Sequence, residues 1–389
     1  MHFKVYIPVF NGAGFLDENL KRIEEEGYLP YIKVIDDAST DQTPKILKRW
    51  KDEKGLEFVS MEINGQKIAS VKKVLEEEER KGTLPEYVIL HDADSFLQVN
   101  NVRYPNGNGK FQKAMEKVIE FMEKMGWAAM AFQDVPYIST NSKWIEKFQY
   151  KEYIWDRSTH YHLGKKGKMR CIPGAGGIFK AKPLLEALSQ HSLKHDGDDM
   201  ETTVLIQKLG YKVGYYSPHV LKKNGFDPKE YPEVIIYTQV PDTFFKLLKQ
   251  RIRWTKGAID VYLKEGRFHL KEMKRKTRLG AQALYEIIKL ITYPGWYWAA
   301  IFYPLFVLPI SIIATGILNV SLALVNPEYK DEFHESKLKM FAFTLIYFFP
   351  LAVYSFILDT LRIPGAYWRV IKERILQRLK KSRFYFLVK

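Results

Sequence analysis

Val88–Asp94 read Val-Ile-Leu-His-Asp-Ala-Asp, an apolar strand that runs directly into two aspartates. The apolar run predicts a strand of a sheet, and the polar residues after it mark the place where the strand ends. Asp92 and Asp94 are therefore expected on an irregular turn at the carboxyl end of that strand.

The first ninety residues alternate between strand-like and helix-like patterns. Strands are expected at Lys4–Val9, Ile32–Ile35, Phe58–Ile63 and Tyr87–Leu90, and helices at Phe15–Glu26, through Ile46–Trp50 and at Ile68–Lys81. Alternation at this spacing predicts an α/β fold, in which a parallel sheet carries helices on both faces and binds ligands beyond the carboxyl ends of its strands. Asp36-Asp37 and Asp92–Asp94 both stand at such ends.

The composition narrows the class of protein. The chain has 389 residues, which suits a globular region plus an appendage, and its 60 Lys and Arg against 45 Asp and Glu give a formal charge of +15. The densest basic runs, Lys264–Arg278 and Arg369–Lys389, flank the most apolar part of the chain, which favours anionic lipid over nucleic acid as a partner. Cys171 is the only cysteine, so an internal disulfide and a cysteine-rich zinc site are excluded.

Two apolar stretches near the end of the chain are long enough to cross a bilayer. Leu290–Pro327 and Met340–Leu358 contain no charged residue, and about 20 apolar residues suffice for a span. Two crossings, with the acidic segment Glu328–Lys337 outside and both basic runs inside, satisfy the bias of Lys and Arg toward the cytoplasm. Three crossings and a buried helix pair in a soluble protein are the alternatives. Because Phe3–Val9 already forms a strand, no export signal is expected, and the catalytic region is predicted to be cytosolic at the cell membrane.

Five motifs occur in order along the chain. They are VYIPVF at 5–10 with Asn11 after it, VIDDASTDQT at 34–43, VILHDAD at 88–94, GDDMETTVLIQKLG at 197–210 and QRIRW at 250–254. Together they resemble the family 2 glycosyltransferases of the GT-A fold, and in particular the membrane-embedded branch typified by hyaluronan, cellulose and chitin synthases. Thr238–Thr243 is also similar to hyaluronan synthases, and the likeness covers residues 3 to 260.

The resemblance implies a domain organisation and a reaction. A GT-A, Rossmann-like catalytic domain is expected at 1–240, interfacial amphipathic helices with the Gln-x-x-Arg-Trp motif at 241–289, transmembrane helices at 290–361 and a basic cytosolic tail at 362–389. The implied reaction is a metal-dependent, inverting transfer of a sugar from a UDP-sugar, or a GDP-sugar, to a growing polysaccharide or a lipid-linked acceptor.

The residues of the motifs suit this chemistry. A nucleoside diphosphate leaves readily when its developing charge is neutralised, which a divalent metal does by bridging the phosphates. Asp92 and Asp94 offer the oxygen ligands that Mg²⁺ or Mn²⁺ accepts. Asp199 stands where the family has its general base, a carboxylate that takes the proton of the acceptor hydroxyl. Trp254 presents a flat apolar face on which a sugar ring can stack.

The family's motifs supply the other site assignments. The nucleotide-binding residues are expected to be Pro8, Asp37, Lys67 and Asp92, and the residues that bind acceptor or diphosphate are expected to be Gly176, Asp198, Gln250, Arg253 and Trp254. Plain structural roles compete with several of these assignments. Asp37 could shape a turn, Lys67 could be a surface lysine, and Asp198 and Asp199 could be acids that the helix macrodipole favours.

Three functions are compatible with the sequence. The first is processive polymer synthesis, for which two crossings offer few helices and an assembly of several copies would complete a channel. The second is the addition of a single sugar to a membrane lipid, as in ceramide glucosyltransferase-like enzymes, which share the Gln-x-x-Arg-Trp motif. The third is a catalytically inactive, nucleotide-sugar-binding scaffold subunit, against which the retained Asp199 argues.

Overall fold

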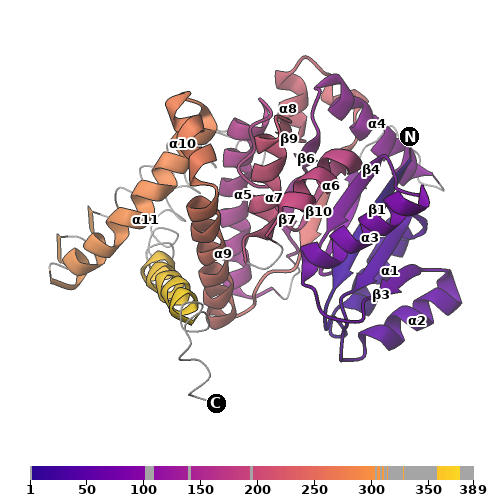
Figure 1. The fold of residues 1–389 in the computed structure, drawn as a ribbon, viewed down its shortest axis with the longest axis horizontal. Helices are drawn as coiled ribbons and strands as arrows, with labels where there is room; N and C mark the ends of the chain where they lie inside the picture. Colours follow the sequence, from indigo (N-terminus) through magenta and orange to yellow (C-terminus); the bar gives the residue numbers. More distant parts are fainter. Residues whose placement is uncertain are drawn as a thin grey trace. The chain divides into compact units, whose positions relative to one another are not determined.

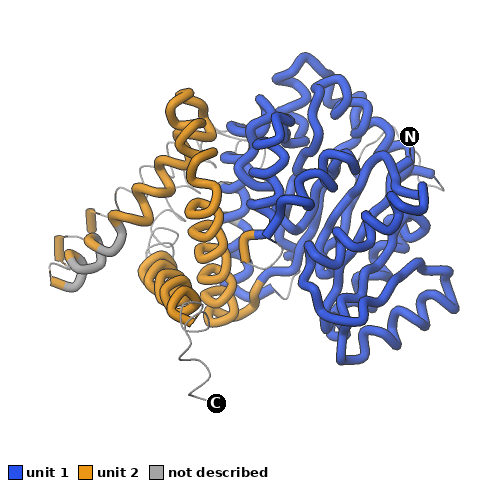
Figure 2. Tube along the Cα trace, viewed as in Figure 1, with its two compact units in different colours: residues 1–194, 198–240 blue, residues 195–197, 241–389 orange. Residues whose placement is uncertain are grey.

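The protein consists of two compact units (Figure 2). The computed structural model describes residues 2–100, 109–138, 142–192, 196–302 and 357–376, with a few isolated positions between 305 and 327. Unit 1 comprises residues 1–194 and 198–240, and unit 2 comprises residues 195–197 and 241–389. The two units are described separately below.

A seven-stranded sheet forms the centre of unit 1 (Figure 1). Its strands, in spatial order, are β3 (Glu57–Ser60), β2 (Ile32–Asp36), β1 (Phe3–Val9), β4 (Tyr87–His91), β8 (Gly176–Lys180), β6 (Ala129–Ala131) and β9 (Val213–Tyr215). The first four strands pair in parallel, which confirms the prediction for that part of the chain. Strand β8 pairs antiparallel with both β4 and β6, so the complete sheet is mixed.

The antiparallel strand has a topological cause. After β4 the chain leaves the large sheet. It continues into β5 (Ser95–Asn100), which belongs to a second sheet of order β5-β10-β7, with β10 at Glu233–Thr238 and β7 at Gln133–Pro136. The chain then returns to the large sheet at β6, leaves it again for β7 and comes back as β8 in the antiparallel direction, which brings Gly176 opposite His91, beside the two aspartates.

Helices bury apolar faces against the large sheet. Those of unit 1 are α1 (Leu16–Glu25), α2 (Thr43–Lys54), α3 (Lys67–Lys81), α4 (Lys110–Lys124), α5 (Trp144–Gly164), α6 (Ala181–Gln190), α7 (Asp198–Lys208) and α8 (Pro218–Lys223), with short 3-10 helices at Leu29–Tyr31 and Pro228–Glu230. In α1 the buried apolar face consists of Leu16, Leu20 and Ile23, at helical spacing. The centre of β1 is fully buried as well, as expected for a strand covered on both faces.

Unit 2 is helical. It contains α9 (Phe244–Lys264), α10 (Gly266–Lys274), α11 (Arg278–Phe302) and a helix at 357–376. On α9, Thr243 caps the first turn through Oγ1, which accepts a hydrogen bond from the Lys246 N–H at 3.4 Å. Ile259 packs against Ala366 and Val370 of the helix at 357–376, which joins that helix to α9.

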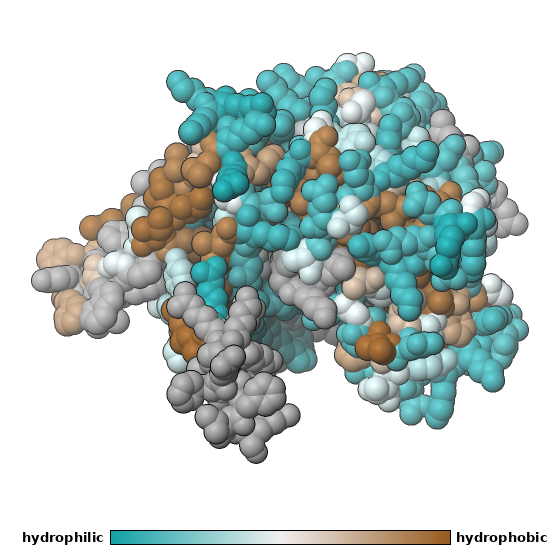
Figure 3. Space-filling model, in the orientation of Figure 1, coloured by the Kyte–Doolittle hydropathy of each residue, from teal (hydrophilic) through white to brown (hydrophobic). Residues whose placement is uncertain are grey.

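The predicted membrane crossings fall mostly outside the described residues. Of the two apolar stretches, only 290–302, a few isolated positions and 357–358 are described. Within the described parts of the chain, no helix combines the length and apolar character that a bilayer span requires. Exposed apolar side chains do gather around α11, as Figure 3 shows, and they include Leu284, Tyr285, Ile288 and Ile291.

Candidate active site

The turn after β4 carries the predicted acidic pair. Asn19 of α1, which is buried, holds this turn: its side-chain amide donates hydrogen bonds to the Ala93 carbonyl at 2.9 Å and to the Ser95 carbonyl at 2.8 Å. Burial raises the pKa of Asp94 to about 6, and the negative charge of Asp92 adds to the rise. The turn is therefore a fixed structure in which burial and the charge of Asp92 disfavour the ionisation of Asp94.

A second pair of acids opens helix α7. The Asp199 carbonyl accepts from Thr203 Oγ1 at 2.9 Å, and the same hydroxyl accepts from the Ile172 N–H at 2.8 Å. The Asp198 carbonyl accepts from Thr202 Oγ1 at 2.8 Å. Removal from solvent raises the pKa of Asp199 to about 7; Lys67 opposes this rise, and the charges of Asp198 and Asp92 add to it. A carboxyl group of this kind is suited to act as a base near neutral pH.

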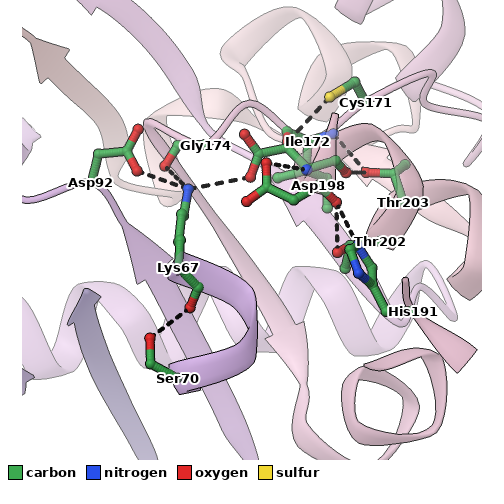
Figure 4. A network of polar contacts seen from close by, with 11 residues as sticks. Lys67, Ser70, Asp92, Cys171, Ile172, Gly174, His191, Asp198, Thr202 and Thr203 are labelled. Carbon is green, nitrogen blue, oxygen red and sulfur yellow. Dashed lines mark hydrogen bonds and ion pairs between the residues drawn. The ribbon is translucent and has the colours of Figure 1, made fainter. Parts of the chain in front are cut away.

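Lys67 joins the two acidic pairs. Its ammonium lies 2.7 Å from Asp92 Oδ1 and 3.2 Å from Asp199 Oδ1, and it also donates to the Gly174 carbonyl at 3.4 Å. Figure 4 shows the side chain of Lys67 reaching between Asp92 and the acids at the start of α7. Removal from solvent alone would lower the pKa of Lys67, but Asp199 and Asp92 outweigh that effect and raise it. The centre formed by Lys67, Asp92 and Asp199 is called the Lys67 centre below.

The loop before Lys67 connects this centre to Asp37. Asp37 follows β2, and its Oδ1 accepts a hydrogen bond from the Gly65 N–H at 2.9 Å. The next residue, Gln66, has a φ of 70°, a region that residues other than glycine rarely adopt. This backbone conformation turns the chain into α3, whose first residue is Lys67. The position of Lys67 thus depends on the carboxylate of Asp37.

A small cavity adjoins the Lys67 centre. Its volume of about 20 Å³ is large enough for one water molecule, and Lys67, Gly174 and Asp199 contribute to its lining. A Cβ on Gly174 would collide with Asp199 Oδ2 and would lie 2.7 Å from Lys67 Nζ, so a larger residue there would displace these two side chains. The surroundings of Gly176 are different, because Gly176 of β8 pairs with His91 of β4 and a Cβ on it would meet Ile236.

The carboxylates at the turn fit a divalent cation. Asp92 and Asp94 supply only oxygen atoms, and a bound cation would offset the charge of Asp92 that raises the pKa of Asp94. Among the residues that the structure describes, no group of three or more His, Cys, Asp or Glu side chains could hold a metal ion by itself. A cation held here would therefore take its other ligands from substrate or water.

The predicted site residues fall into separate groups. The structure brings Lys67, Asp92 and Asp199 into contact, with Asp94 and Asp198 beside them, and Asp37 is linked to them through the Gly65 loop. Pro8 is buried in β1, paired with Ile35 of β2. Gln250, Arg253 and Trp254 lie on α9 of unit 2. Cys171 is kept as a thiol, since burial raises its pKa and disfavours a thiolate.

Two functional features escaped the reading of the sequence. Arg251 is buried, donates to Gln250 Oε1 at 2.7 Å and lies 4.1 Å from the centre of the Trp254 ring, so it orients two of the predicted residues. The central place of Lys67 was the other. Lys67 was assigned to the nucleotide, but its contacts with both acidic pairs were not predicted. A lysine as the first residue of a helix is unfavourable next to the positive end of the macrodipole, and that signal could have indicated acidic partners.

Two family models match the chain. A model described as glycosyl transferase family group 2 matches residues 87–358, and one described as glycosyl transferase family 2 matches residues 4–103. A poly-beta-1,6-N-acetyl-D-glucosamine synthase of Staphylococcus epidermidis is 24% identical over 237 residues, which are 60% of this chain and 48% of that protein. An N-acetylglucosaminyltransferase of Azorhizobium caulinodans is 19% identical over 273 residues, which are 65% of this chain and 59% of that protein.

The chain thus spans between about half and three fifths of the length of these two relatives. Among solved structures, a mannosyltransferase from Pyrobaculum calidifontis in complex with GDP-Man and Mn²⁺ has a similar fold, with a TM-score of 0.50 and 18% identity, over 91% of this chain and 86% of that one. The α/β architecture with its mixed sheet is accordingly GT-A-like. Because one family model covers well over half of the chain, the protein belongs to glycosyl transferase family group 2.

Proposed function

We propose that this protein transfers a sugar, with inversion, from a nucleoside diphosphate sugar to a carbohydrate or lipid-linked acceptor. The observation that carries the proposal is the Lys67 centre, in which one ammonium contacts both an acid of the β4 turn and an acid of α7. Nucleotide-sugar transfer needs compensation of phosphate charge and a base for the acceptor, and this centre supplies a group for each.

Each residue has a part in the proposed reaction. Asp199 takes the proton of the acceptor hydroxyl while that oxygen forms a bond to the anomeric carbon and the bond from this carbon to the diphosphate breaks. Asp92 and Asp94 would hold a divalent cation, which when bound neutralises the negative charge of the diphosphate. Lys67 donates to the phosphate oxygens from the other side, and Asp37 accepts hydrogen bonds from the nucleoside.

N-acetylglucosamine is the sugar that we propose as the donor group. Both curated relatives are named for N-acetylglucosamine transfer or polymerisation. We keep UDP as the preferred nucleotide and GDP as the alternative, since the solved mannosyltransferase was obtained with GDP-Man. A screen of purified protein against UDP-N-acetylglucosamine, UDP-glucose and GDP-mannose tests this choice. Turnover of only the GDP-sugar would contradict it.

The size of the product separates the two modes of transfer. Polymer synthesis is our first choice, because one relative is named as a polymer synthase. Labelled donor should then yield long chains whose length grows with time. A glycolipid that carries a single sugar would instead support transfer to a membrane lipid.

Loss of activity on treatment with EDTA, followed by recovery with Mn²⁺, tests the metal role of Asp92 and Asp94, and full activity in EDTA would rule it out.

We also propose that unit 2 binds the inner surface of the cell membrane. Apolar residues on α11 are exposed, as are Ile371 and Ile375 on the helix at 357–376, and the basic run 264–278 lies in the same unit. Basic residues next to exposed apolar side chains favour anionic bilayer surfaces. The full chain should float with vesicles of phosphatidylglycerol more than with vesicles of phosphatidylcholine at low salt. Equal recovery in the absence of vesicles would contradict membrane binding.

A further inference from the structure

Lys256 of α9 forms a second centre of opposite charges, in unit 2. Its side chain is only 4% exposed, and three carboxylate oxygens surround the ammonium: Glu373 Oε2 at 3.0 Å, Asp260 Oδ2 at 3.1 Å and Asp196 Oδ2 at 3.2 Å. A buried ammonium is stable only when acids compensate its charge. These four residues are called the Lys256 centre.

The three acids come from three separate segments. Asp260 lies one turn further along α9, Asp196 precedes α7, and Glu373 lies on the helix at 357–376. Without the ammonium, three negative charges would face one another at short range, and mutual repulsion would separate the segments. Lys256 therefore holds together parts of the chain that are distant in sequence.

Two glycines bring the same segments into direct contact. A Cβ on Gly257 would lie 2.5 Å from the Asp196 carbonyl and from the Gly197 nitrogen, and a Cβ on Gly197 would lie 2.5 Å from the Gly257 carbonyl oxygen. The backbone of α9 thus touches residues 196–197 with no side chain in between. Because the contact is backbone to backbone, it leaves little freedom for this segment to shift along α9.

Residues 196–197, which contact α9, are followed directly by the helical turn that carries the proposed base, Asp199. Residues 196–197 group with unit 2, while residues 198–240 belong to unit 1 (Figure 2). Helix α7 begins at Asp198, immediately after Gly197, and Asp199 is its second residue. The first turn of α7 is therefore restrained at one end by its hydrogen bonds in unit 1 and at the other end by the Lys256 centre.

We infer that Lys256 is a positioning residue for Asp199: it fixes residues 196–197 to α9 and so holds the first turn of α7 in place for catalysis. This inference rests on the proposed function, in which Asp199 is the general base. Lys256 touches no reacting atom in this scheme, and the effect reaches Asp199 through the backbone of residues 196–198. A misplacement of a catalytic group by about 1 Å can slow a reaction by about 100-fold.

The test replaces Lys256 in the full-length protein. In Lys256→Met we expect kcat to fall by about 10- to 100-fold, because the base is misplaced, while KM for the donor changes by less than about threefold. Lys256→Arg keeps the positive charge, and its kcat should be at least tenfold higher than that of Lys256→Met. If Lys256 contributed only to stability, Lys256→Met would yield less folded protein. The kcat of the folded fraction would then equal that of the wild type, and Lys256→Arg would have no loss of kcat to restore.

A matched control is available in unit 1. Lys33 pairs with Glu57 at 2.8 Å and with Glu78 at 2.7 Å, and its side chain is also largely buried. Lys33→Met removes a paired lysine of similar kind, so it should lower the thermal stability without changing kcat or KM. If Lys33→Met and Lys256→Met reduce kcat equally, the positioning role is wrong.

A second measurement does not depend on turnover. Hydrogen exchange of the amides at 198–202 should become faster in Lys256→Met than in the wild type, and should stay unchanged in Lys33→Met. Unchanged exchange at 198–202 in Lys256→Met would overturn the inference. If the wild type transfers no sugar from any donor but the exchange still accelerates, the proposed function fails while the restraint by Lys256 stands.

Discussion

The Lys67 centre and the Lys256 centre are built from the same groups in different surroundings. Each has one ammonium that contacts carboxylates from distant segments. The side chain of Lys67 is 23% exposed and borders a cavity, whereas that of Lys256 is 4% exposed and packed beside a contact between two glycines. The accessible Lys67 ammonium can exchange its partners for ligand atoms, while the enclosed Lys256 ammonium can only hold its own segments together; the acids of both centres remain partly exposed.

The comparison also separates the energetics of the two centres. A partly exposed ion pair contributes little to stability, because solvent screens it and the side chains keep alternative partners. Removal of one partner from an enclosed group of charges leaves the others uncompensated and costs far more. Changes at the Lys67 centre should therefore alter turnover more than stability, and changes at the Lys256 centre should alter both.

The largest effect is expected from Asp199→Asn. The amide cannot accept the proton of the acceptor, so transfer should fall by about 1000-fold, while the affinity for UDP changes by less than about threefold. Radiolabelled transfer and calorimetric binding of UDP measure the two quantities. Asp227→Asn is the control, since Asp227 only caps a short helix through the Lys229 N–H. Normal turnover of Asp199→Asn would show that Asp199 is not the general base.

Lys67→Met should have the next largest effect, about 100-fold in kcat/KM, because a donor to phosphate is lost. The dependence of kcat on pH gives a second test, in which the direction of the shift is also predicted. Asp199 must be ionised to act as a base, so wild-type kcat should rise with pH and level off above its pKa of about 7. Lys67 lowers that pKa, so the profile of Lys67→Met should shift to higher pH. Lys72→Met, on the same helix, should leave the profile in place; a shift in both variants would point to a general effect of charge.

Gly257→Ala should disturb the enclosed centre without touching a charge. The new methyl group would meet the Asp196 carbonyl, and such overpacking costs about 1–3 kcal/mol. We expect a lower unfolding temperature and a kcat reduced by about tenfold. Gly266→Ala is matched to it, since a Cβ there has open space around it. Equal stability of the two variants would show that the backbone contact does not constrain the segment.

Glu373→Gln should have the smallest effect. Glu373 is the most exposed member of the Lys256 centre, with 51% of its side chain accessible, and its loss should reduce the free energy of unfolding by no more than about 1 kcal/mol. Turnover should fall by about two- to threefold. Chemical denaturation and initial rates provide the two values. A loss as large as that of Lys256→Met would mean that the centre depends on its outermost acid rather than on its enclosure.

The positions of the acids in the Lys67 centre can be predicted from the sequence, whereas the Lys256 centre cannot. The acids of the Lys67 centre follow strands or open a helix, so the local pattern indicates where they lie. The Lys256 centre joins Asp196 and Glu373, which no local pattern connects, and a lysine on an amphipathic helix is ordinarily solvated. The burial of Lys256 is a property of tertiary packing alone.

The antiparallel β8 escaped prediction for a related reason. Its residues are apolar and fit a strand of either direction, and the direction is decided by the path of the chain through the second sheet. Likewise, Gly174 and Gly176 lie in one glycine-rich run and look equivalent in the sequence. Only the three-dimensional arrangement shows that Gly174 borders Asp199 and that Gly176 packs on Ile236.

The short loop at Gly65 has a consequence for how a donor molecule is recognised. The carboxylate of Asp37 holds the Gly65 N–H, and Lys67 follows only two residues later. In the proposed reaction, a nucleobase that competes for Asp37 should therefore perturb the lysine assigned to the phosphates. Uridine and pyrophosphate, offered as separate fragments, should influence each other's affinity, and the affinity of the intact nucleotide should differ from the simple sum of its parts.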